Sequence, residues 1–373
     1  MICRNCRGGN FELFCDLGYQ PLANNYLTYQ QLNHEPEVYY PLRPKTCTAC
    51  GLVQLEDVGV EFTPAYAFEA GASQPWVEHT ERLAQFLVER FDPDTVLEIG
   101  SNDGTLLRAF RDLGVCGVGV DPAGHGDYVA RVPWTLDLAL TMRGTQDLII
   151  GTNVLAHVDD LDDFLNGVHV ALAENGVAVF EVPDTQTMVE HGRFEMVYHE
   201  HLTYFTHATL LDALSRRGLH VFAIQHPHTH GGSIRVLAQR SPMAGPLTSS
   251  HRLPNFRQTP QAIRHRIRQA WPTEGVLGWG ASAKASTLLN FLGFTSEQVY
   301  AIADSTPSKQ GKLMPGSHIP ITDEERWHDW PVETVIILSF NYEDAIREKI
   351  AKMRSKPRIL SLADYRRSLA PSA

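Results

Sequence analysis

Residues 196–206 read MVYHEHLTYFT and bring together side chains that can donate or accept a proton. Tyr198, His199, Glu200 and His201 are consecutive in this stretch. Such groups suit a catalytic base with its hydrogen-bonding partners, a metal centre, or a polar loop without chemistry. The metal alternative is weak, because His199 and His201 share a face only in an extended chain and diverge on a helix. The stretch also lacks the H-E-x-x-H spacing of zinc protease helices.

Four cysteines form two pairs, each with two residues between its members: Cys3 and Cys6 in CRNC, and Cys47 and Cys50 in CTAC. A two-residue spacer lets both sulfurs of a tight turn point at one ion, and two such turns supply the four thiolates of a closed structural zinc site. The alternative is a redox or accidental C-x-x-C pair. The gap between the pairs is longer than in a compact zinc ribbon, so an insertion must lie between them. This zinc would stabilise a small lobe and catalyse nothing.

The segment DTVLEIGSNDGTLLRAFRDLGVCGVGVDPA (residues 94–123) predicts a strand, a glycine turn, a helix and a second strand that ends at Asp121. The turn resembles the first motif of class I S-adenosylmethionine methyltransferases. Glycines let the backbone pass close to the cofactor, and an acid after the second strand can hold both ribose hydroxyls. The turn lacks G-x-G-x-x-G, which favours a cofactor without a pyrophosphate. The predicted cofactor contacts here are Glu98, Gly100, Asn102, Asp103, Gly104 and Asp121.

A third strand is predicted from Asp147 to about Asn153, which adds Asn153 to the cofactor contacts. HVDDLDDFL then starts a helix with acidic residues in its first turn. His157 lies where the carboxyl edge of the sheet meets the cofactor, and it is either a functional group or a histidine at a helix start. The next strand, VAVFEVP, leads toward the YHEH motif, and ligands of open α/β sheets bind at this edge.

The C-terminal third repeats the strand, glycine turn and helix pattern in GVLGWGASAKASTLLNFLGF. A stretch rich in Pro, Ser and Gly near residues 242–260 predicts a linker before it. A second strand ending at Asp304 and two further strands complete a smaller Rossmann-like unit. The helix start at Ala281 with Lys284 beside it suits a diphosphate. The alternative is an ordinary glycine turn.

Length and composition limit the class of protein. At 373 residues the chain is long enough for two or three domains, and we expect boundaries at 1–75, 76–241 and 242–373. The formal charge of −11, without a basic block, disfavours a nucleic-acid partner. No apolar run is long enough for a membrane span, and the polar N-terminus has no signal-peptide core. We therefore expect a cytoplasmic protein with reduced thiols.

Several long motifs in one order resemble the sugar C-methyltransferase family of deoxysugar biosynthesis over nearly the whole chain. They are CRNC…CTACGL, EIGSNDGTLL, NVLAHVDDLDDF, VYHEHLTYFT, HGGSIRV and GWGASAKASTLLN. The resemblance implies an α/β protein with a zinc-binding N-terminal lobe, a class I methyltransferase core that uses S-adenosylmethionine, and a C-terminal Rossmann-like domain for the nucleotide sugar. It implies methylation at C3 of a nucleotide-linked 4-keto-6-deoxyhexose.

The resemblance also implies roles within the YHEH motif. His201 is expected to be the base, since a histidine pKa lies near working pH. Glu200 would contact a sugar hydroxyl or tune the base, and Tyr198 would donate to the sugar or its oxyanion. His199 is expected to be a structural hydrogen-bonding residue. The alternative for His201 is a positioning role, with Tyr198 or another group moving the proton.

Further contacts of the sugar nucleotide are expected from Tyr66, His230, Ser233, Ala281 and Lys284. The nucleotide, thymidine or guanosine diphosphate, stays open, as do the sugar stereoisomer and retention or inversion at C3. The oligomeric state is also open, with a monomer favoured. Two alternatives compete with C-methylation: a methyltransferase of the same architecture acting on oxygen, nitrogen or another sugar carbon, and a non-catalytic protein that binds nucleotide sugar or S-adenosylmethionine.

Overall fold

The computed structural model describes residues 1–60, 62, 69–241, 253–352 and 356–366. Contacts divide the chain into two compact units. The first contains Met1–Glu12, Thr46–Gln186 and His201–Leu253, and the second contains Leu13–Lys45, Thr187–Glu200 and Pro254–Ala373. Both cysteine pairs thus belong to the first unit, whereas the insertion between them belongs to the second. The three domain boundaries expected from the sequence stay a prediction.

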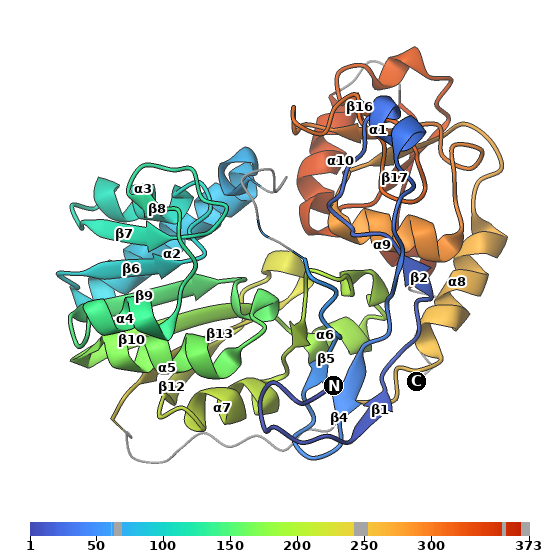
Figure 1. Cartoon of the computed structure of the whole chain (residues 1–373). Helices are drawn as coiled ribbons and strands as arrows, with labels where there is room; N and C mark the ends of the chain where they lie inside the picture. Colours follow the sequence, from blue (N-terminus) through green and yellow to red (C-terminus); the bar gives the residue numbers. More distant parts are fainter. Residues whose placement is uncertain (61, 63–68, 242–252, 353–355, 367–373) are drawn as a thin grey trace, which may run out of the picture. The chain divides into compact units, whose positions relative to one another are not determined.

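The first unit is built on a seven-stranded sheet in the order β12-β13-β10-β9-β6-β7-β8 (Figure 1). Neighbouring strands are parallel, except that β13 is antiparallel to both β10 and β12. This is the class I methyltransferase arrangement, so the predicted fold class is confirmed. The strands are β6 (Val96–Ile99), β7 (Gly117–Val120), β8 (Val129–Ala130), β9 (Gln146–Thr152), β10 (Leu172–Pro183), β12 (His220–Gln225) and β13 (Ser233–Gln239).

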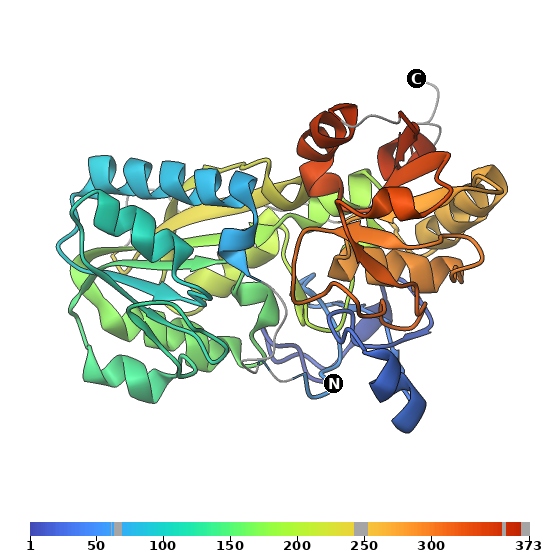
Figure 2. The same cartoon turned by 90° about the horizontal axis from the view of Figure 1, so that it is seen from above.

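Helices cover both faces of this sheet, which is why its central strands are mostly apolar. Successive side chains of a strand point to opposite faces, and accordingly Val179 and Phe180 of β10 belong to two different buried clusters. The helices α2 (Gln74–Phe91) and α3 (Thr105–Asp112) pack on one face. Figure 2 shows α2, in light blue, along that face.

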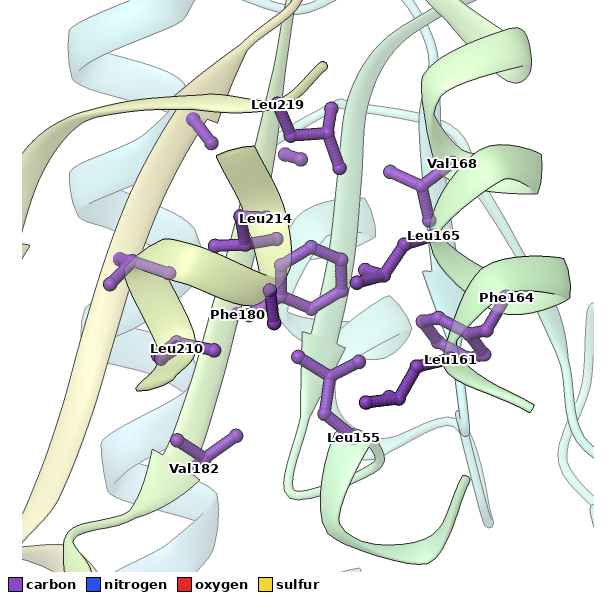
Figure 3. Packing of buried hydrophobic residues seen from close by; sticks show 14 of the residues in the cluster. Leu155, Leu161, Phe164, Leu165, Val168, Phe180, Val182, Leu210, Leu214 and Leu219 are labelled. Atoms are coloured by element: carbon purple, nitrogen blue, oxygen red, sulfur yellow. The ribbon is translucent and has the colours of Figure 1, made fainter. Parts of the chain in front are cut away.

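The opposite face is covered by α5 (Leu161–Ala171) and α7 (His207–Ser215). Figure 3 shows Phe180 between Leu165 of α5 and Leu214 of α7. The predicted acidic start of α5 is confirmed: the Asp160 carboxylate accepts from the amides of the first turn. The remaining helical segments of this unit are η1 (Ala70–Ala72), α4 (Leu136–Thr141), η2 (Leu155–His157) and η4 (Thr229–Gly231), and α6 (Thr185–Glu190) leads into the second unit.

The zinc lobe, meaning residues 1–12 and 46–60, contributes most of a four-stranded sheet in the order β1-β4-β5-β11. Its fourth strand comes from the chain directly after the YHEH motif. The strands are β1 (Phe11–Leu13), β4 (Lys45–Cys47), β5 (Val53–Gln54) and β11 (Thr203–Tyr204). Cys3, Cys47 and Leu52 belong to the same buried cluster as Phe180, so the lobe shares the core of the first unit.

The second unit contains a five-stranded parallel sheet in the order β16-β15-β14-β17-β18. The predicted strand ending at Asp304 is confirmed as β15. The strands are β14 (Val276–Trp279), β15 (Ile302–Asp304), β16 (Ile321–Asp323), β17 (Thr334–Ile337) and β18 (Arg358–Ser361), with a separate pair β2 (Tyr19–Gln20) and β3 (Tyr40–Pro41). The helical segments are α1 (Tyr29–His34), η3 (Phe194–Met196), α8 (Thr259–Ala270), α9 (Ala283–Leu292), η5 (Trp327–Asp329), η6 (Phe340–Tyr342), α10 (Glu343–Ala351) and α11 (Leu362–Arg366).

Among the helices that the structure describes, none has the length and apolar character needed to cross a membrane.

Candidate active site

The four predicted zinc ligands converge in the zinc lobe. The Sγ atoms of Cys3, Cys6, Cys47 and Cys50 all lie within 4.8 Å of one another. The Cys3–Cys50 distance is 3.5 Å and the Cys6–Cys47 distance is 3.6 Å. A tetrahedral zinc with Zn–S bonds of about 2.3 Å requires sulfurs separated by about 3.8 Å. The cluster therefore fits zinc, and its four thiolates would hold the ion in a closed structural site.

Every second residue of the glycine turn after β6 has a left-handed backbone. Gly100, Asn102 and Gly104 have φ angles of +76°, +51° and +74°. Glycine and asparagine are the residues that adopt this region at low cost. The Gly100 amide donates to the Val120 carbonyl at 2.8 Å, which ties the turn to β7. Gly104 then immediately precedes α3, so the turn delivers the chain to a helix start as predicted.

Two buried carboxylates border this turn. Asp121 accepts from the amides of Asn102 at 2.8 Å and Ala123 at 2.7 Å, so it fixes the turn and the end of β7 together. Each of its oxygens keeps a second lone pair. Glu98, on β6, has an Oε2 atom with no hydrogen-bond partner among the described residues. Burial, and then the charges of Asp103 and Asp121, hold the pKa of Glu98 well above its ordinary value. A cationic or hydroxyl-bearing ligand would satisfy this arrangement, and S-adenosylmethionine carries both groups.

Asn102 and Asp103 also hold the segment before α2. The Asn102 Oδ1 accepts from the Ala70 amide at 3.0 Å, and the Asp103 Oδ2 accepts from the Gly71 amide at 2.7 Å. Their side chains thus anchor η1 next to the glycine turn. On the other side, the amide of Asn153 donates to the Glu181 carbonyl at 2.7 Å, with Asn153 in a left-handed conformation at the end of β9 (φ +58°). All the predicted cofactor residues consequently gather at the carboxyl edge of one sheet.

His201 is buried at the same edge of the first unit. Its ring meets that of His157 at a centroid distance of 4.8 Å, with an interplanar angle of 66°. The ring of Tyr204 lies 6.1 Å away on another side. His157 ends η2, the segment that follows β9 and Asn153. The structure therefore brings His201 and the cofactor loops together within one compact unit.

Tyr198, His199 and Glu200 belong to the second unit, so the chain passes from one unit to the other between Glu200 and His201. The Oε1 of Glu200 accepts from the amide and the side-chain nitrogen of Asn24, at 3.1 and 3.0 Å. Burial raises the pKa of Glu200. His199 is buried edge-on to Tyr40, and burial lowers its pKa, which favours a neutral ring. Tyr198 is half-buried.

The predicted diphosphate residues lie at the start of α9. The amide of Ala281 donates to Asp304 at 2.6 Å, and its carbonyl accepts from Tyr26 and Lys309 at 2.8 and 2.9 Å. The Lys284 ammonium lies 5.1 Å from the centroid of the Phe340 ring. Burial lowers the pKa of Lys284 to about 8, although Glu195 opposes this shift.

Comparison with known proteins identifies the family. Residues 3–60 match a model of a zinc binding domain, residues 72–224 a methyltransferase domain, and residues 255–358 a C-methyltransferase C-terminal domain. C-methyltransferase NovU from Streptomyces niveus is 30% identical over 382 positions, which span 92% of this chain and 90% of that protein. The chain belongs to the sugar C-methyltransferase family. It is an S-adenosylmethionine-dependent C-methyltransferase, as the sequence resemblance implied, and the predicted zinc lobe is confirmed.

Solved structures of other methyltransferases are more distant from this C-methyltransferase. A 1,6-didemethyltoxoflavin-N1-methyltransferase from Burkholderia thailandensis is 15% identical, covers 52% of this chain and 97% of its own, and gives a TM-score of 0.38. Magnesium protoporphyrin IX methyltransferase from Synechocystis is 16% identical, covers 44% of this chain and 83% of its own, and gives a TM-score of 0.34. The family assignment rests on NovU and the family models alone.

Not every predicted sugar contact of the C-methyltransferase can be placed. Tyr66 lies outside the described residues, and so does the side chain of His230. Ser233 is buried at the start of β13, where its hydroxyl donates to the Thr229 carbonyl at 3.1 Å and its oxygen lies 3.2 Å from the oxygen of the Thr229 hydroxyl. The Thr229 hydroxyl donates in turn to Glu181 at 2.6 Å. Ser233 is thus part of a buried polar network.

Two residues of the C-methyltransferase that hold buried partners were missed by sequence reasoning. Glu181 on β10 accepts from His79 at 3.0 Å and from the Arg235 guanidinium at 3.0 and 2.8 Å. Asn24 holds Glu200 from a position far away in the chain. A signal existed for Glu181, because a lone acid within the apolar run VAVFEVP requires a buried partner. No such signal exists for Asn24, because polar residues in a loop can form many kinds of hydrogen bond.

Proposed function

We propose that this C-methyltransferase methylates C3 of a nucleotide-linked 4-keto-6-deoxyhexose, with His201 as the base that removes the C3 proton. The observation that carries the proposal is the burial of His201 against His157, in the unit that also contains the cofactor loops. A ketone at C4 acidifies the C3 hydrogen, and a histidine near neutral pKa is suited to remove it. The resulting enolate carbon is the nucleophile.

S-adenosylmethionine, when bound, supplies a cationic methyl donor. Glu98 is proposed to receive its ammonium group, because the buried carboxylate has an oxygen without a partner among the described residues. Asp121 would hold the ribose hydroxyls with its second lone pairs, and Asn153 would border the cofactor at the end of β9. Gly100 and Gly104 leave room for close approach, while Asn102 and Asp103 hold the turn and η1.

Tyr198, Glu200 and the start of α9 are proposed to contact the sugar nucleotide. Glu200 would accept from a sugar hydroxyl while Asn24 fixes its orientation. Tyr198 would donate to the oxyanion at C4, which stabilises the developing enolate. Because the amides of Ala281 and Ala285 already donate to Asp304 and to the Ser282 hydroxyl, the ammonium of Lys284 and the amides of Ala283 and Lys284 would be the donors for a diphosphate.

The reaction is tested by incubating the enzyme in deuterated water with 4-keto-6-deoxyhexoses linked to thymidine or guanosine diphosphate. We expect deuterium at C3 of one of them without a methyl donor, and a C3-methylated product when the donor is added. An O- or N-methylated product with no C3 exchange would refute the enolate mechanism. Binding without any turnover would favour the non-catalytic alternative.

Replacing Asp121 by alanine is expected to weaken S-adenosylmethionine binding by about 10²-fold. The change removes hydrogen bonds of a charged group worth about 1.5–3 kcal/mol each and leaves the buried amides of Asn102 and Ala123 without an acceptor. Calorimetric titration with S-adenosylhomocysteine measures the affinity. Asp127→Ala is the control, since this carboxylate lies in the same loop after β7 but is exposed. Equal affinities for the two variants would contradict the assignment.

A further inference from the structure

We propose that the zinc lobe positions His201, and that Gln54 is the residue through which the first cysteine turn (residues 3–6) does so. The inference rests on the proposed function only for the role of His201 as base. A structural zinc is usually understood as a local stabiliser of its own lobe. Here a continuous chain of hydrogen bonds within the first unit runs from the zinc ligands to the segment that carries His201.

The first link joins the first cysteine turn to β5. The buried side chain of Gln54 accepts from the Arg4 amide at 2.9 Å and donates to the Ile2 carbonyl at 3.0 Å. The Arg4 guanidinium donates to the Leu55 carbonyl at 2.7 Å. The backbone on both sides of Cys3 is therefore bonded to Gln54, and the Arg4 side chain is bonded to Leu55. The second cysteine turn leads into the same strand, with the Cys47 amide donating to the Leu52 carbonyl at 2.8 Å.

The second link joins β5 to the chain after His201. Gln54 and Val53 pair antiparallel with Thr203 and Tyr204 of β11. The amide of Leu55 donates to the carbonyl of Leu202 at 2.9 Å. A strand of two residues cannot persist alone in water, because backbone pairing of this length does not offset the entropy lost in ordering it. The conformation of β11 thus depends on β5, and β5 depends on both cysteine turns.

The third link joins β11 to η2 and so sets the two histidines against each other. The amide of Leu202 donates to the Ala156 carbonyl at 2.7 Å, and the Thr203 hydroxyl donates to the Leu155 carbonyl at 3.1 Å. Leu202 follows His201 directly, and His157 follows Ala156 directly. Residues 202–203 are consequently held between the zinc lobe and η2, and this fixes the 4.8 Å contact of the two rings.

Arg7, the residue that follows the first cysteine turn, makes an attachment that bypasses β5. Arg7 donates through Nε to Asp162 of α5 at 2.8 Å, at an exposed site. This attachment serves as a matched control, because it anchors the same turn without touching residues 53–55 or 202–204. Asn suits position 7, since Arg7 has a left-handed backbone (φ +61°) that asparagine tolerates.

Gln54→Met is the first test, compared with Arg7→Asn. Methionine keeps the size of the side chain and removes both hydrogen bonds. We expect Gln54→Met to lower kcat for C3 exchange by about 10–10²-fold, as misplacement of a reacting group does. Zinc content, S-adenosylhomocysteine affinity and the KM for the sugar nucleotide should stay as in the unmodified protein. Arg7→Asn should leave kcat unchanged. A wild-type kcat in folded, zinc-loaded Gln54→Met overturns the proposal.

Thr203 supplies a second test if Gln54→Met fails to fold. Thr203→Val removes the hydroxyl bonded to Leu155 but keeps the branched shape, and Thr203→Ser keeps the hydroxyl. We expect a lower kcat with an unchanged KM in the valine variant and recovery in the serine variant. Equal kcat values for both variants contradict the proposal.

Hydrogen exchange after zinc removal gives a readout that needs no substrate. A chelator should accelerate amide exchange in a peptide covering residues 201–206 by at least about 10-fold, because β11 loses its partner strand. Peptides from β9 and β10 should keep their protection. Unchanged protection of residues 201–206 in zinc-free protein refutes the coupling, whereas loss of C3 exchange activity alone would bear only on the proposed reaction.

Discussion

Replacing His201 by asparagine is expected to lower the rate of C3 deuterium exchange by about 10³-fold, within the range that general-base groups contribute. Asparagine keeps a polar group of similar reach but cannot accept a proton at neutral pH. Because His201 belongs to the first unit and packs against His157, the change should leave the cofactor loops intact. NMR detection of exchange without a methyl donor measures the step directly.

His199→Asn is the matched control for His201→Asn. Both histidines are buried and lie two residues apart, but His199 faces Tyr40 in the second unit. We expect His199→Asn to lower stability while the exchange rate per folded molecule stays within about 10-fold of the unmodified enzyme, since the proposed proton transfer uses His201 instead. If His199→Asn lost the exchange and His201→Asn kept it, the base would have to be reassigned.

Replacing Glu181 by glutamine is expected to lower the free energy of unfolding by about 3–5 kcal/mol, the usual cost of breaking a buried ion pair by removing one partner. Glu181 is fully buried, and glutamine leaves the charge of Arg235 without compensation. Urea denaturation followed by tryptophan fluorescence measures the loss. Thr229→Val, which removes a single hydrogen bond to the same carboxylate, should cost about 1–2 kcal/mol. Equal losses for the two variants would contradict an ion-pair role.

The same carboxylate predicts a pH dependence of stability. Burial alone would raise the pKa of Glu181, but the hydrogen bond and charge of His79 and the charge of Arg235 outweigh it and lower the pKa to about 2. A depressed carboxyl pKa stabilises the folded state above the unfolded value of 4.5, and this contribution is lost as the pH falls toward about 2. Between pH 4.5 and 2 the stability of Glu181→Gln should therefore decline less steeply than that of the unmodified protein.

Local patterns in the sequence predicted the elements that carry the site. The order of strands, turns and helices around the glycine turn follows from short runs of apolar residues, and the structure confirms β6, α3, β7 and the acidic start of α5. The cysteine spacing predicted a four-sulfur cluster because a two-residue spacer lets both sulfurs of a tight turn point at one ion. These features depend on residues close together in the chain, and the spacing of residue types along the chain predicts such local structure well.

The assembly of these elements depended on contacts that no local pattern encodes. Sequence spacing predicted an insertion between the cysteine pairs but not that residues 13–45 belong to the second unit. It placed Glu200 within the YHEH motif but not against Asn24, and it gave no reason to pair Gln54 with Thr203.

The sequence by itself determined which chemical groups are available: thiolates for zinc, a glycine turn and acids for a cofactor, and a histidine motif at the edge of a sheet. Only the tertiary structure decided which groups support one another. Glu181 with Arg235, Glu200 with Asn24, and β5 with β11 are each joined across a large part of the chain. The physical reason is that burial, which makes such polar pairs necessary, is a property of the packed core and exists only after distant segments have met.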